Sequence, residues 1–425
     1  MKMIIKNGRV VDPANNLDKI CDLAIDNGKI VAFEHLPENF GAEKTLDATD
    51  KWVIPGLIAV MCRTQTKHSQ STTLSEEGQA ALKRGITSLC LAPDSEPLQD
   101  NAAAVLRKTQ KMPGLASPHV YPIGALTLGL QGSTLTDLVA LKEAGCIAFS
   151  NVQKPLPDLQ FLRHCYEYAA NFNLLVMIQP NEAALAKGGV AHEGLIATRL
   201  GLPGIPETAE TLAIAQHLLL IAQTGVRAHF TCLSTRAGVD LIQAAKAQGL
   251  AVTSDTAMHS LHLSEMDLID FNPNCHLYPP LRSVLDQAGL QRAVQENTID
   301  LLSCDHRPLE AIAKLAPFGD TQPGLSALDT LFSLGLQLVN VQKLTLNRLI
   351  LSLSTRPAQI FGLPGGSLSV GSPADLCLID PKKYWTVTEN TLFSKGKNTP
   401  FMGWQLPGVV THTLIQGQVV YEHES

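Results

Sequence analysis

The chain has 425 residues, of which 45% are hydrophobic and 17% charged, so it can form one large domain and a smaller one. A net charge of -6 without any basic run argues against nucleic acid or an anionic membrane as a partner. The N-terminal apolar stretch is too short for a signal-peptide core or a membrane span, and the nine cysteines form no CxxC pair. These features predict a cytoplasmic protein without disulfides, whose partners are proteins or small molecules.

Both ends of the chain alternate apolar and polar residues between turn residues, which is typical of short β-strands. The N-terminal end predicts strands over 3–11, 22–33 and 44–53, and the C-terminal end predicts strands over 374–380 and 408–422. Strand-rich ends around a different middle predict a small β-sandwich domain built from both termini, residues 1–53 and 367–425.

Between the two ends, short β-rich runs alternate with amphipathic segments of helical period, a pattern that favours a parallel α/β fold. Eight runs have the length of strands: 53–62, 86–93, 119–127, 146–151, 174–180, 227–234, 251–257 and 298–306. Segments with the apolar spacing of helices lie between them: 75–84, 135–144, 158–171, 207–224 and 237–248. Eight such units predict a (β/α)8 barrel over residues 54–366. A doubly wound open sheet is the structural alternative, but no GxGxxG follows the first strand.

Several motifs follow one another in a fixed order along almost the whole chain. They include Val53-Ile54-Pro55-Gly56-Leu57-Ile58, Leu233-Ser234-Thr235-Arg236-Ala237-Gly238, Pro279-Pro280-Leu281-Arg282 and Lys397-Asn398-Thr399-Pro400-Phe401-Met402-Gly403-Trp404. Together they make the chain resemble bacterial dihydroorotases of the amidohydrolase superfamily. The resemblance implies a barrel in which strand-end imidazoles and carboxylates hold one or two zinc ions that generate hydroxide and polarise a cyclic amide.

Most metal-ligand positions of that family carry other residues here. The first-strand HxH pair corresponds to Met61 and Arg63, and the bridging carboxylate of the fourth strand corresponds to Asn151. The histidines of the fifth and sixth strands correspond to Gln179 and Cys232. The aspartate of the eighth strand is kept as Asp305.

Zinc needs three or four protein ligands, and Cys232 and Asp305 are the only plausible survivors. The family's substrate-binding arginine and asparagine positions are Gln65 and Asp94, so the groups that hold the substrate carboxylate are lost too. The sequence therefore predicts no bound metal, no cofactor and a silent site. We expect Arg63 to lie near Asp305 and to supply the positive charge that a metal would supply.

Other combinations of residues could still carry chemistry. A different metal site could use histidines, and His259 with His262 has a suitable spacing, although such side chains are more often structural. Cys232 and His306 could form a thiol nucleophile and its base, but the sequence shows no orienting third group. Asp305 with His306 could act as an acid-base pair, which alone would contribute about 10² to 10⁴-fold. The histidines considered for a metal site are His68, His229, His259, His262 and His306.

The resemblance extends to a non-catalytic dihydroorotase-like chain of bacterial aspartate transcarbamoylase complexes. It implies a structural subunit that assembles the aspartate transcarbamoylase catalytic chain in pyrimidine biosynthesis, as a homo-oligomer within a hetero-oligomer. The alternative is an active dihydroorotase or another cyclic-amide hydrolase, with an atypical metal site or with Asp305 alone. A third class is a regulator whose barrel mouth binds a metabolite through Arg63 and Gln65.

Overall fold

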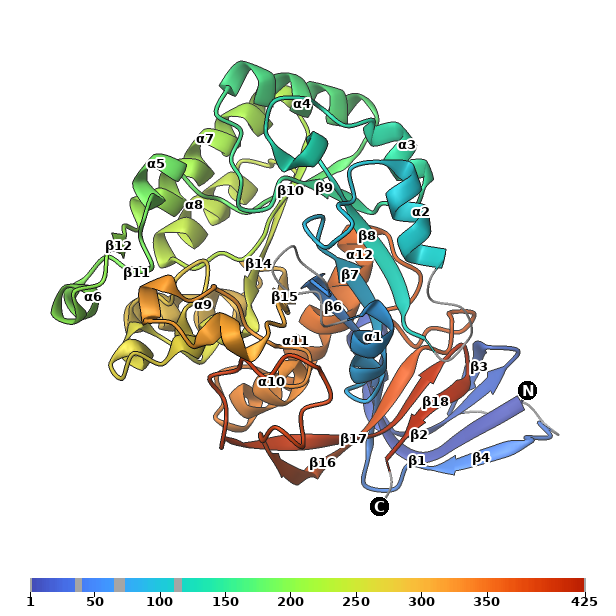
Figure 1. The fold of residues 1–425 in the computed structure, drawn as a ribbon. Coiled ribbons are helices and arrows are strands. Elements are labelled where there is room, and N and C mark those ends of the chain that lie inside the picture. Colours follow the sequence, from blue (N-terminus) through green and yellow to red (C-terminus); the bar gives the residue numbers. More distant parts are fainter. Residues whose placement is uncertain (1, 35–39, 65–72, 111–116, 424–425) are drawn as a thin grey trace.

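A computed structural model describes residues 2–34, 40–64, 73–110 and 117–423 of the chain. Its largest part is a barrel of eight parallel strands, which follow one another around the sheet in chain order (Figure 1). The strands are β6 (Leu57–Cys62), β7 (Ile86–Leu91), β8 (His119–Ala125), β9 (Ala148–Ser150), β10 (Leu175–Ile178), β13 (Arg227–Phe230), β14 (Val252–Ala257) and β15 (Leu301–Ser303). The predicted (β/α)8 barrel is confirmed, and each of the eight predicted runs contains one of these strands.

Backbone hydrogen bonds join the first and last barrel strands just beyond the regular pairing. The amide of Cys304 donates to the carbonyl of Val60 at 3.0 Å, and the amide of Arg63 donates to the carbonyl of His306 at 2.9 Å. These bonds bring the ends of β6 and β15 together, so residues that follow the two strands can contact one another.

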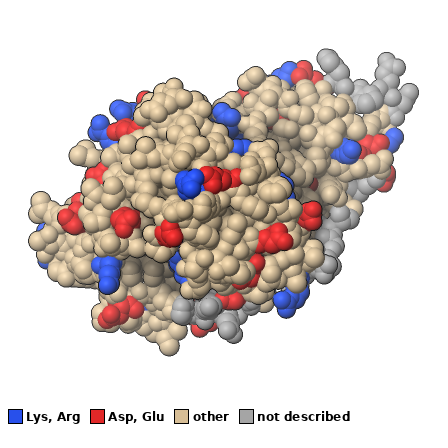
Figure 2. Space-filling view, turned by 90° about the horizontal axis from the view of Figure 1, so that it is seen from above, with Lys and Arg blue, Asp and Glu red and all other residues tan. Residues whose placement is uncertain are grey.

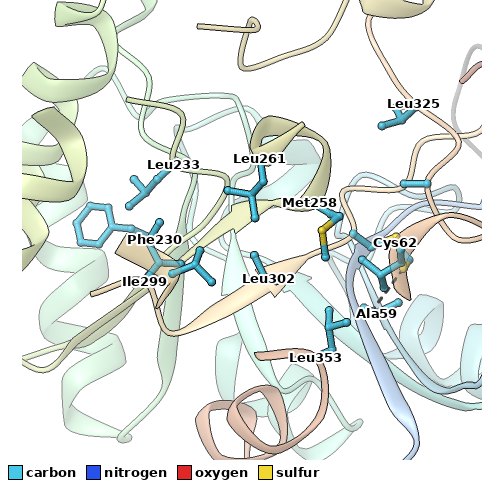
Figure 3. Packing of buried hydrophobic residues seen from close by; sticks show 14 of the residues in the cluster. Ala59, Cys62, Phe230, Leu233, Met258, Leu261, Ile299, Leu302, Leu325 and Leu353 are labelled. Atoms are coloured by element: carbon cyan, nitrogen blue, oxygen red, sulfur yellow. Dashed lines mark hydrogen bonds between the residues drawn. The ribbon is translucent and has the colours of Figure 1, made fainter. Parts of the chain in front are cut away.

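Apolar residues alternate between the inside and the outside of the barrel. Ile58 and Val60 of β6, and Leu175 and Met177 of β10, belong to a core cluster inside the barrel. Their neighbours along each strand belong to the larger cluster between the sheet and the helices. Figure 3 shows part of this larger cluster, with Ala59, Phe230 and Leu302 from the strands beside Met258, Leu261 and Leu353.

Helices cover the outside of the barrel (Figure 1). An excursion of two short strands and two short helices lies between β10 and α7: α5 (Ala183–Ala186), β11 (Ala191–His192), α6 (Leu195–Leu200) and β12 (Gly204–Ile205). The remaining helices are α1 (Leu74–Leu82), α2 (Ala102–Gln110), α3 (Leu138–Glu143), α4 (Leu159–Asn171), α7 (Thr208–Thr224), α8 (Arg236–Ala247), α9 (Val284–Gln295), α10 (Leu331–Asn340), α11 (Leu346–Ile350) and α12 (Arg356–Phe361).

Local sequence signals set several helix ends. Thr73 and Glu76 form a capping box at the start of α1, in which each side chain accepts from the other residue's amide. Thr235 caps α8 by accepting from the amide of Gly238. Gly225 ends α7 in the left-handed conformation that glycine adopts without a steric penalty.

The strands at the two ends of the chain form a second, mainly antiparallel sheet. Its order is β18-β17-β16-β5-β1-β2-β3, with β4 paired to β1, so the expected small β domain takes the form of one hydrogen-bonded sheet. N-terminal strands (blue) and C-terminal strands (red) lie side by side in Figure 1 because β5 pairs with β16. The strands are β1 (Lys2–Asp12), β2 (Leu17–Asp26), β3 (Lys29–Phe33), β4 (Lys44–Asp47), β5 (Trp52–Pro55), β16 (Leu376–Thr386), β17 (Gln405–Ile415) and β18 (Gln418–Glu422).

The predicted strand 53–62 is divided between the two sheets at Gly56. Residues before it belong to β5 in the terminal sheet, and residues after it belong to β6 in the barrel. A side chain at Gly56 would meet Thr87 of β7, because a Cβ built there lies 2.2 Å from the Thr87 Oγ1. Glycine therefore lets the chain pass close to β7 as it changes sheets.

Charged side chains are mixed on the face of the molecule that Figure 2 shows. Figure 2 shows basic and acidic side chains interspersed over one face, without a block of either sign. Among the residues that the structure describes, no helix is both long and apolar enough to cross a membrane.

Candidate functional site

The residues expected at the old metal and substrate positions gather at one end of the barrel. Met61 lies in β6, and Arg63 follows that strand directly. Asp94 follows β7, Asn151 follows β9, Gln179 follows β10, Cys232 follows β13 and Asp305 follows β15. These are the carboxyl ends of the strands, where barrel enzymes place their chemistry. Gln65 lies outside the described residues.

Arg63 occupies the centre of this end of the barrel as a fully buried side chain. Its Nη1 donates to the Asp305 Oδ1 at 2.8 Å, which confirms the expected proximity of the two residues. Its Nε lies 3.0 and 2.9 Å from the two carboxylate oxygens of Asp94. The strands β7 and β15 lie on either side of β6. The guanidinium of Arg63, which follows β6, therefore links the carboxylate that follows β7 to the carboxylate that follows β15.

Asp94 also faces a second arginine. The Arg307 Nη2 lies 3.6 Å from the Asp94 Oδ2, and Arg307 follows β15 two residues after Asp305. From the sequence, Asp94 marked only the loss of a substrate-binding group. In the structure it is instead the partner of Arg63, so the ion-pair cluster contains two arginines and two aspartates.

The charges within the cluster stabilise one another. Burial alone would lower the pKa of Arg63, but the carboxylates of Asp94 and Asp305 outweigh it and raise that pKa above its ordinary value. Burial would raise the pKa of Asp94, but the charges of Arg63 and Arg307 lower it overall. Burial and the neighbouring Arg63 lower the pKa of Arg307. At neutral pH the cluster holds ionised groups of both signs.

Several residues at the strand ends adopt left-handed backbone conformations that are uncommon for residues other than glycine. The φ angle is 61° at Met61, 57° at Cys232, 42° at Asp305 and 46° at Val152. Such conformations cost about 1–3 kcal/mol each and persist when surrounding contacts impose them. The backbone at the barrel mouth thus keeps a strained geometry at three of the positions where the family has metal ligands.

The amide side chains at two old ligand positions differ in their contacts. Asn151 is fully engaged, since its Oδ1 accepts from the Thr127 Oγ1 at 2.6 Å and its Nδ2 donates to the Lys154 carbonyl at 2.8 Å. Gln179 is buried, and neither its Oε1 nor its Nε2 has a hydrogen-bond partner among the described residues.

Cys232 belongs to a buried polar network inside the barrel. Its amide donates to the Asp255 Oδ1 at 2.8 Å, and the same oxygen accepts from the Ser303 Oγ at 2.5 Å. The other oxygen of Asp255 lies 2.9 Å from the His229 Nε2, so His229 is a satisfied core residue as expected. Burial, followed by the nearby charges of Asp305 and Asp255, raises the pKa of the Cys232 thiol well above its usual range. These surroundings therefore favour the neutral thiol over the thiolate that a nucleophile needs.

Both ring nitrogens of His306 make hydrogen bonds within the fold, so the side chain is not available as a base. Its Nε2 donates to the Glu77 Oε2 at 3.1 Å, because its Nδ1 accepts from the Ala327 amide at 3.0 Å. Both ring nitrogens are thus occupied within the fold, which argues against the pairs of His306 with Cys232 or Asp305 as catalytic units.

The remaining histidines do not assemble a metal site. His262 contacts the Leu334 carbonyl at 3.0 Å, and burial lowers the pKa of His259 and of His262 to about 4. His68 lies outside the described residues. Within the described ranges, no group of three or more His, Cys, Asp and Glu side chains could hold a metal ion.

Sequence reasoning missed Arg307 and Asp255 as parts of this region. Arg307 stands two residues after Asp305, and a cation that close to a strand end is a signal that could have marked it. Asp255 lies within the seventh strand and is fully buried, and a charged residue inside a barrel strand indicates a buried partner.

Models of two families match the chain: Dihydro-orotase-like over residues 50–238, and Amidohydrolase family over residues 320–421. A dihydroorotase-like protein from Pseudomonas putida is 42% identical over 425 residues, which is 100% of both chains. A dihydroorotase from Trichlorobacter lovleyi is 35% identical over 423 residues, with 99% of each chain covered.

Solved structures agree with the fold. The L-hydantoinase of Arthrobacter aurescens superposes with a TM-score of 0.89 at 24% identity, covering 99% of this chain and 96% of its own. A D-hydantoinase superposes with a TM-score of 0.86 at 23% identity, covering 99% and 95%. With full-length relatives at 42% identity, the chain belongs to the dihydroorotase-like proteins of the amidohydrolase superfamily.

Proposed function

We propose that this chain is a catalytically inactive dihydroorotase homologue that serves as a structural subunit for aspartate transcarbamoylase in the cytoplasm. The observation that carries the first half is the position of Arg63. Its guanidinium bonds to Asp305, the one carboxylate kept from the family's metal ligands, and to Asp94.

The zinc that the family implies does not fit these residues. A guanidinium is permanently charged, and Arg63 lies within hydrogen-bond distance of the carboxylate that a cation would need. The other surviving ligand type, Cys232, is a buried neutral thiol. Two ligands would also fall short of the three that a catalytic zinc site uses.

The relatives support the same proposal. Those at 42% identity, from two Pseudomonas species, carry the name dihydroorotase-like protein. Relatives named dihydroorotase are 34–35% identical to this chain over nearly its full length. The chain is thus more similar to these relatives named dihydroorotase-like protein than to these relatives named dihydroorotase.

An assembly role would explain why a barrel without its ligands stays intact. Ion pairs at the mouth keep the strand ends together, so the fold can persist for the sake of its outer surface. The named partner, the catalytic chain of aspartate transcarbamoylase, comes from the family resemblance, because a fold alone does not specify a partner. We propose that the chain forms a homo-oligomer within that hetero-oligomer.

A metal and activity measurement tests the first half. The purified chain, incubated with zinc and dialysed, is expected to hold far less than one zinc per chain and to leave dihydroorotate unhydrolysed. The dihydroorotase of Trichlorobacter lovleyi, treated in the same way, is the positive control. One tightly bound zinc per chain together with turnover would show that the chain is an enzyme.

Co-expression tests the second half. The aspartate transcarbamoylase catalytic chain of the same organism is produced with and without this chain, and the products are compared by size and by transcarbamoylase activity. We expect a larger, more active assembly that contains both chains in a fixed ratio. A catalytic chain that assembles and turns over equally well alone would remove the structural role.

A further inference from the structure

A cavity of about 510 Å³ opens beside the ion-pair cluster at the mouth of the barrel. The loops that follow β7, β8, β9 and β15 surround it, together with residues 322–323. Its volume is in the range of small-molecule sites. Asp94 and Arg307 connect this cavity to the buried cluster around Arg63.

Arg307 places a guanidinium at the cavity, and most hydrogen-bond donors of this guanidinium have no partner among the described residues. The Arg307 side chain is only 17% exposed, yet its guanidinium makes no hydrogen bond among the described residues. Its one ion contact, to Asp94, is long at 3.6 Å, and both oxygens of Asp94 already accept from Arg63. The chain fixes its position, because the Arg307 amide donates to the Leu325 carbonyl at 2.7 Å and its side chain packs over Gly324. Arg307 is a preorganised fork for a carboxylate.

Glu96 brings an unmatched anion to the same cavity. Its Oε1 is buried and has no hydrogen-bond partner among the described residues. Neither Arg307 nor Lys154, the other cation at the cavity, lies within ion-pair distance of it in the part of the chain that the structure describes. A buried carboxylate oxygen without a partner is costly unless something satisfies it.

We propose that this cavity binds a zwitterionic α-amino acid with an aliphatic side chain. Arg307, supported by Lys154, would donate hydrogen bonds to the carboxylate, and Glu96 would accept hydrogen bonds from the ammonium group. Apolar side chains on the cavity wall would pack against the aliphatic part: Leu98, Leu130, Val152 and Leu309. The groups that would bind the two charges are Arg307, Lys154 and Glu96, not the residues at the family's substrate-binding positions, Gln65 and Asp94, and the site does not depend on the proposed assembly role.

The charge balance favours a zwitterion over a simple anion. Arg63 and Arg307 offset Asp94 and Asp305 within the cluster, and Lys154 offsets Glu96 at the cavity. A ligand with one charge of each sign keeps the site neutral and satisfies both unmatched groups. An anion alone would leave Glu96 without a partner and add a net negative charge.

Titration calorimetry on the purified chain at pH 7 tests the proposal with three matched probes. L-leucine carries both charges, 4-methylpentanoate lacks the ammonium group and 3-methylbutylamine lacks the carboxylate. We expect L-leucine to bind at least about tenfold more tightly than either of the others, which corresponds to about 1.4 kcal/mol. Equal affinity for 4-methylpentanoate, or no heat from L-leucine at about 20 mM, would overturn the zwitterion site.

Four variants test where the ligand binds. Arg307→Gln is expected to weaken L-leucine binding by more than about tenfold, and Glu96→Gln is expected to weaken L-leucine but leave 4-methylpentanoate unchanged. Lys382→Gln, at an exposed ion pair in the terminal sheet, is the matched control and should bind like the wild type. Circular dichroism checks that each variant is folded, and Arg307→Lys, which keeps the charge without the fork, should bind with intermediate affinity. Wild-type affinity in both Arg307→Gln and Glu96→Gln would refute the assignment, whatever the co-expression experiment shows.

Discussion

Arg63 holds together two carboxylates that would otherwise repel each other in a buried place. Asp94 comes from the end of β7 and Asp305 from the end of β15, and each bonds to a different part of the same guanidinium. A lysine could not reach both in this way, because its ammonium is a single point of charge on a flexible stem. The arginine is therefore a structural tie between the two strands that flank β6.

Replacing Arg63 by a residue of similar length but without charge tests that role. Arg63→Met leaves both aspartates short of a counter-ion, so we expect the free energy of unfolding to fall by about 3–5 kcal/mol. Arg63→Lys should lose less. Urea denaturation measures both.

A triple variant separates loss of charge balance from loss of packing. In Arg63→Met/Asp94→Asn/Asp305→Asn neither aspartate position is left as an unpaired carboxylate, and only Arg307 loses its ion contact, so part of the stability should return. If Arg63→Met alone unfolds at the wild-type urea concentration, the ion pairs do not hold the strand ends together.

The lowered pKa of Asp94 predicts how acid weakens the fold. A carboxyl group whose pKa is lower in the folded state contributes stability that is fully present above its unfolded pKa of about 3.9. That contribution is lost as the pH falls through the folded value, since protonation then removes the pairing with Arg63 and Arg307. The wild type should therefore lose stability below about pH 4.

The Asp94→Asn variant isolates this effect from other acidic groups. Its difference in unfolding free energy from the wild type should be constant near neutral pH and should shrink below about pH 4. Urea midpoints measured between pH 7 and pH 3 give the comparison. A difference that stays the same down to pH 3 would mean that Asp94 gains nothing from its arginines.

At the scale of secondary structure, the junction between β5 and β6 decides how the two sheets are joined. Gly56 lies at this junction, and a Cβ there would lie 2.2 and 2.5 Å from the Oγ1 and Cγ2 of Thr87. We expect Gly56→Ala to lower the unfolding free energy by about 1–3 kcal/mol, because either Thr87 or the backbone must move. Thermal or urea denaturation gives the value.

A double-mutant cycle shows whether the clash is the cause. Thr87→Ala removes the two closest atoms and leaves a Cβ at 2.8 Å, so Gly56→Ala should cost less in that background. An equal cost in both backgrounds would point instead to the backbone conformation of residue 56.

Strand and helix positions were predictable from the sequence, because local periodicity and caps determine them. All eight barrel strands lie within the predicted runs, and the ends of α4 and α8 lie within one residue of the predicted segments 158–171 and 237–248. The split of run 53–62 at Gly56 was not predictable, since apolar residues continue through it and only the contact with Thr87 separates the two strands.

The site was predictable in part, for a similar reason. The pairing of Arg63 with Asp305 followed from two metal-ligand positions of the family, on the first and eighth strands, and from the need to compensate a buried charge. The bonds from Arg63 to Asp94, and the approach of Arg307, depend on how long side chains turn across strand ends, which spacing along the chain does not specify.

At the scale of the whole molecule, side-chain contacts join the terminal sheet to the barrel, in addition to the chain connection at β5–β6. The Trp385 indole of β16 donates to the Ser333 Oγ of α10 at 3.0 Å, and the Arg84 guanidinium lies 3.9 Å from the Trp385 ring. Arg84, just after α1, also bonds to Asp329 at 3.1 Å. The two parts therefore share polar and aromatic contacts in addition to the β5–β6 connection.

These contacts predict that the barrel and the terminal sheet unfold in one step. The three tryptophans, Trp52, Trp385 and Trp404, all belong to the terminal segments, so their fluorescence reports on that sheet and its contacts. Far-UV circular dichroism at the helical band reports on the barrel, which holds the helices. We expect the two signals to change at the same urea concentration, as for a single cooperative unit.

In Arg84→Leu, which removes the contacts with Trp385 and Asp329, both transitions should move to lower urea concentrations together. If fluorescence changes well before circular dichroism in the wild type, the terminal sheet is an independent folding unit and the contacts through Trp385 do not couple it to the barrel.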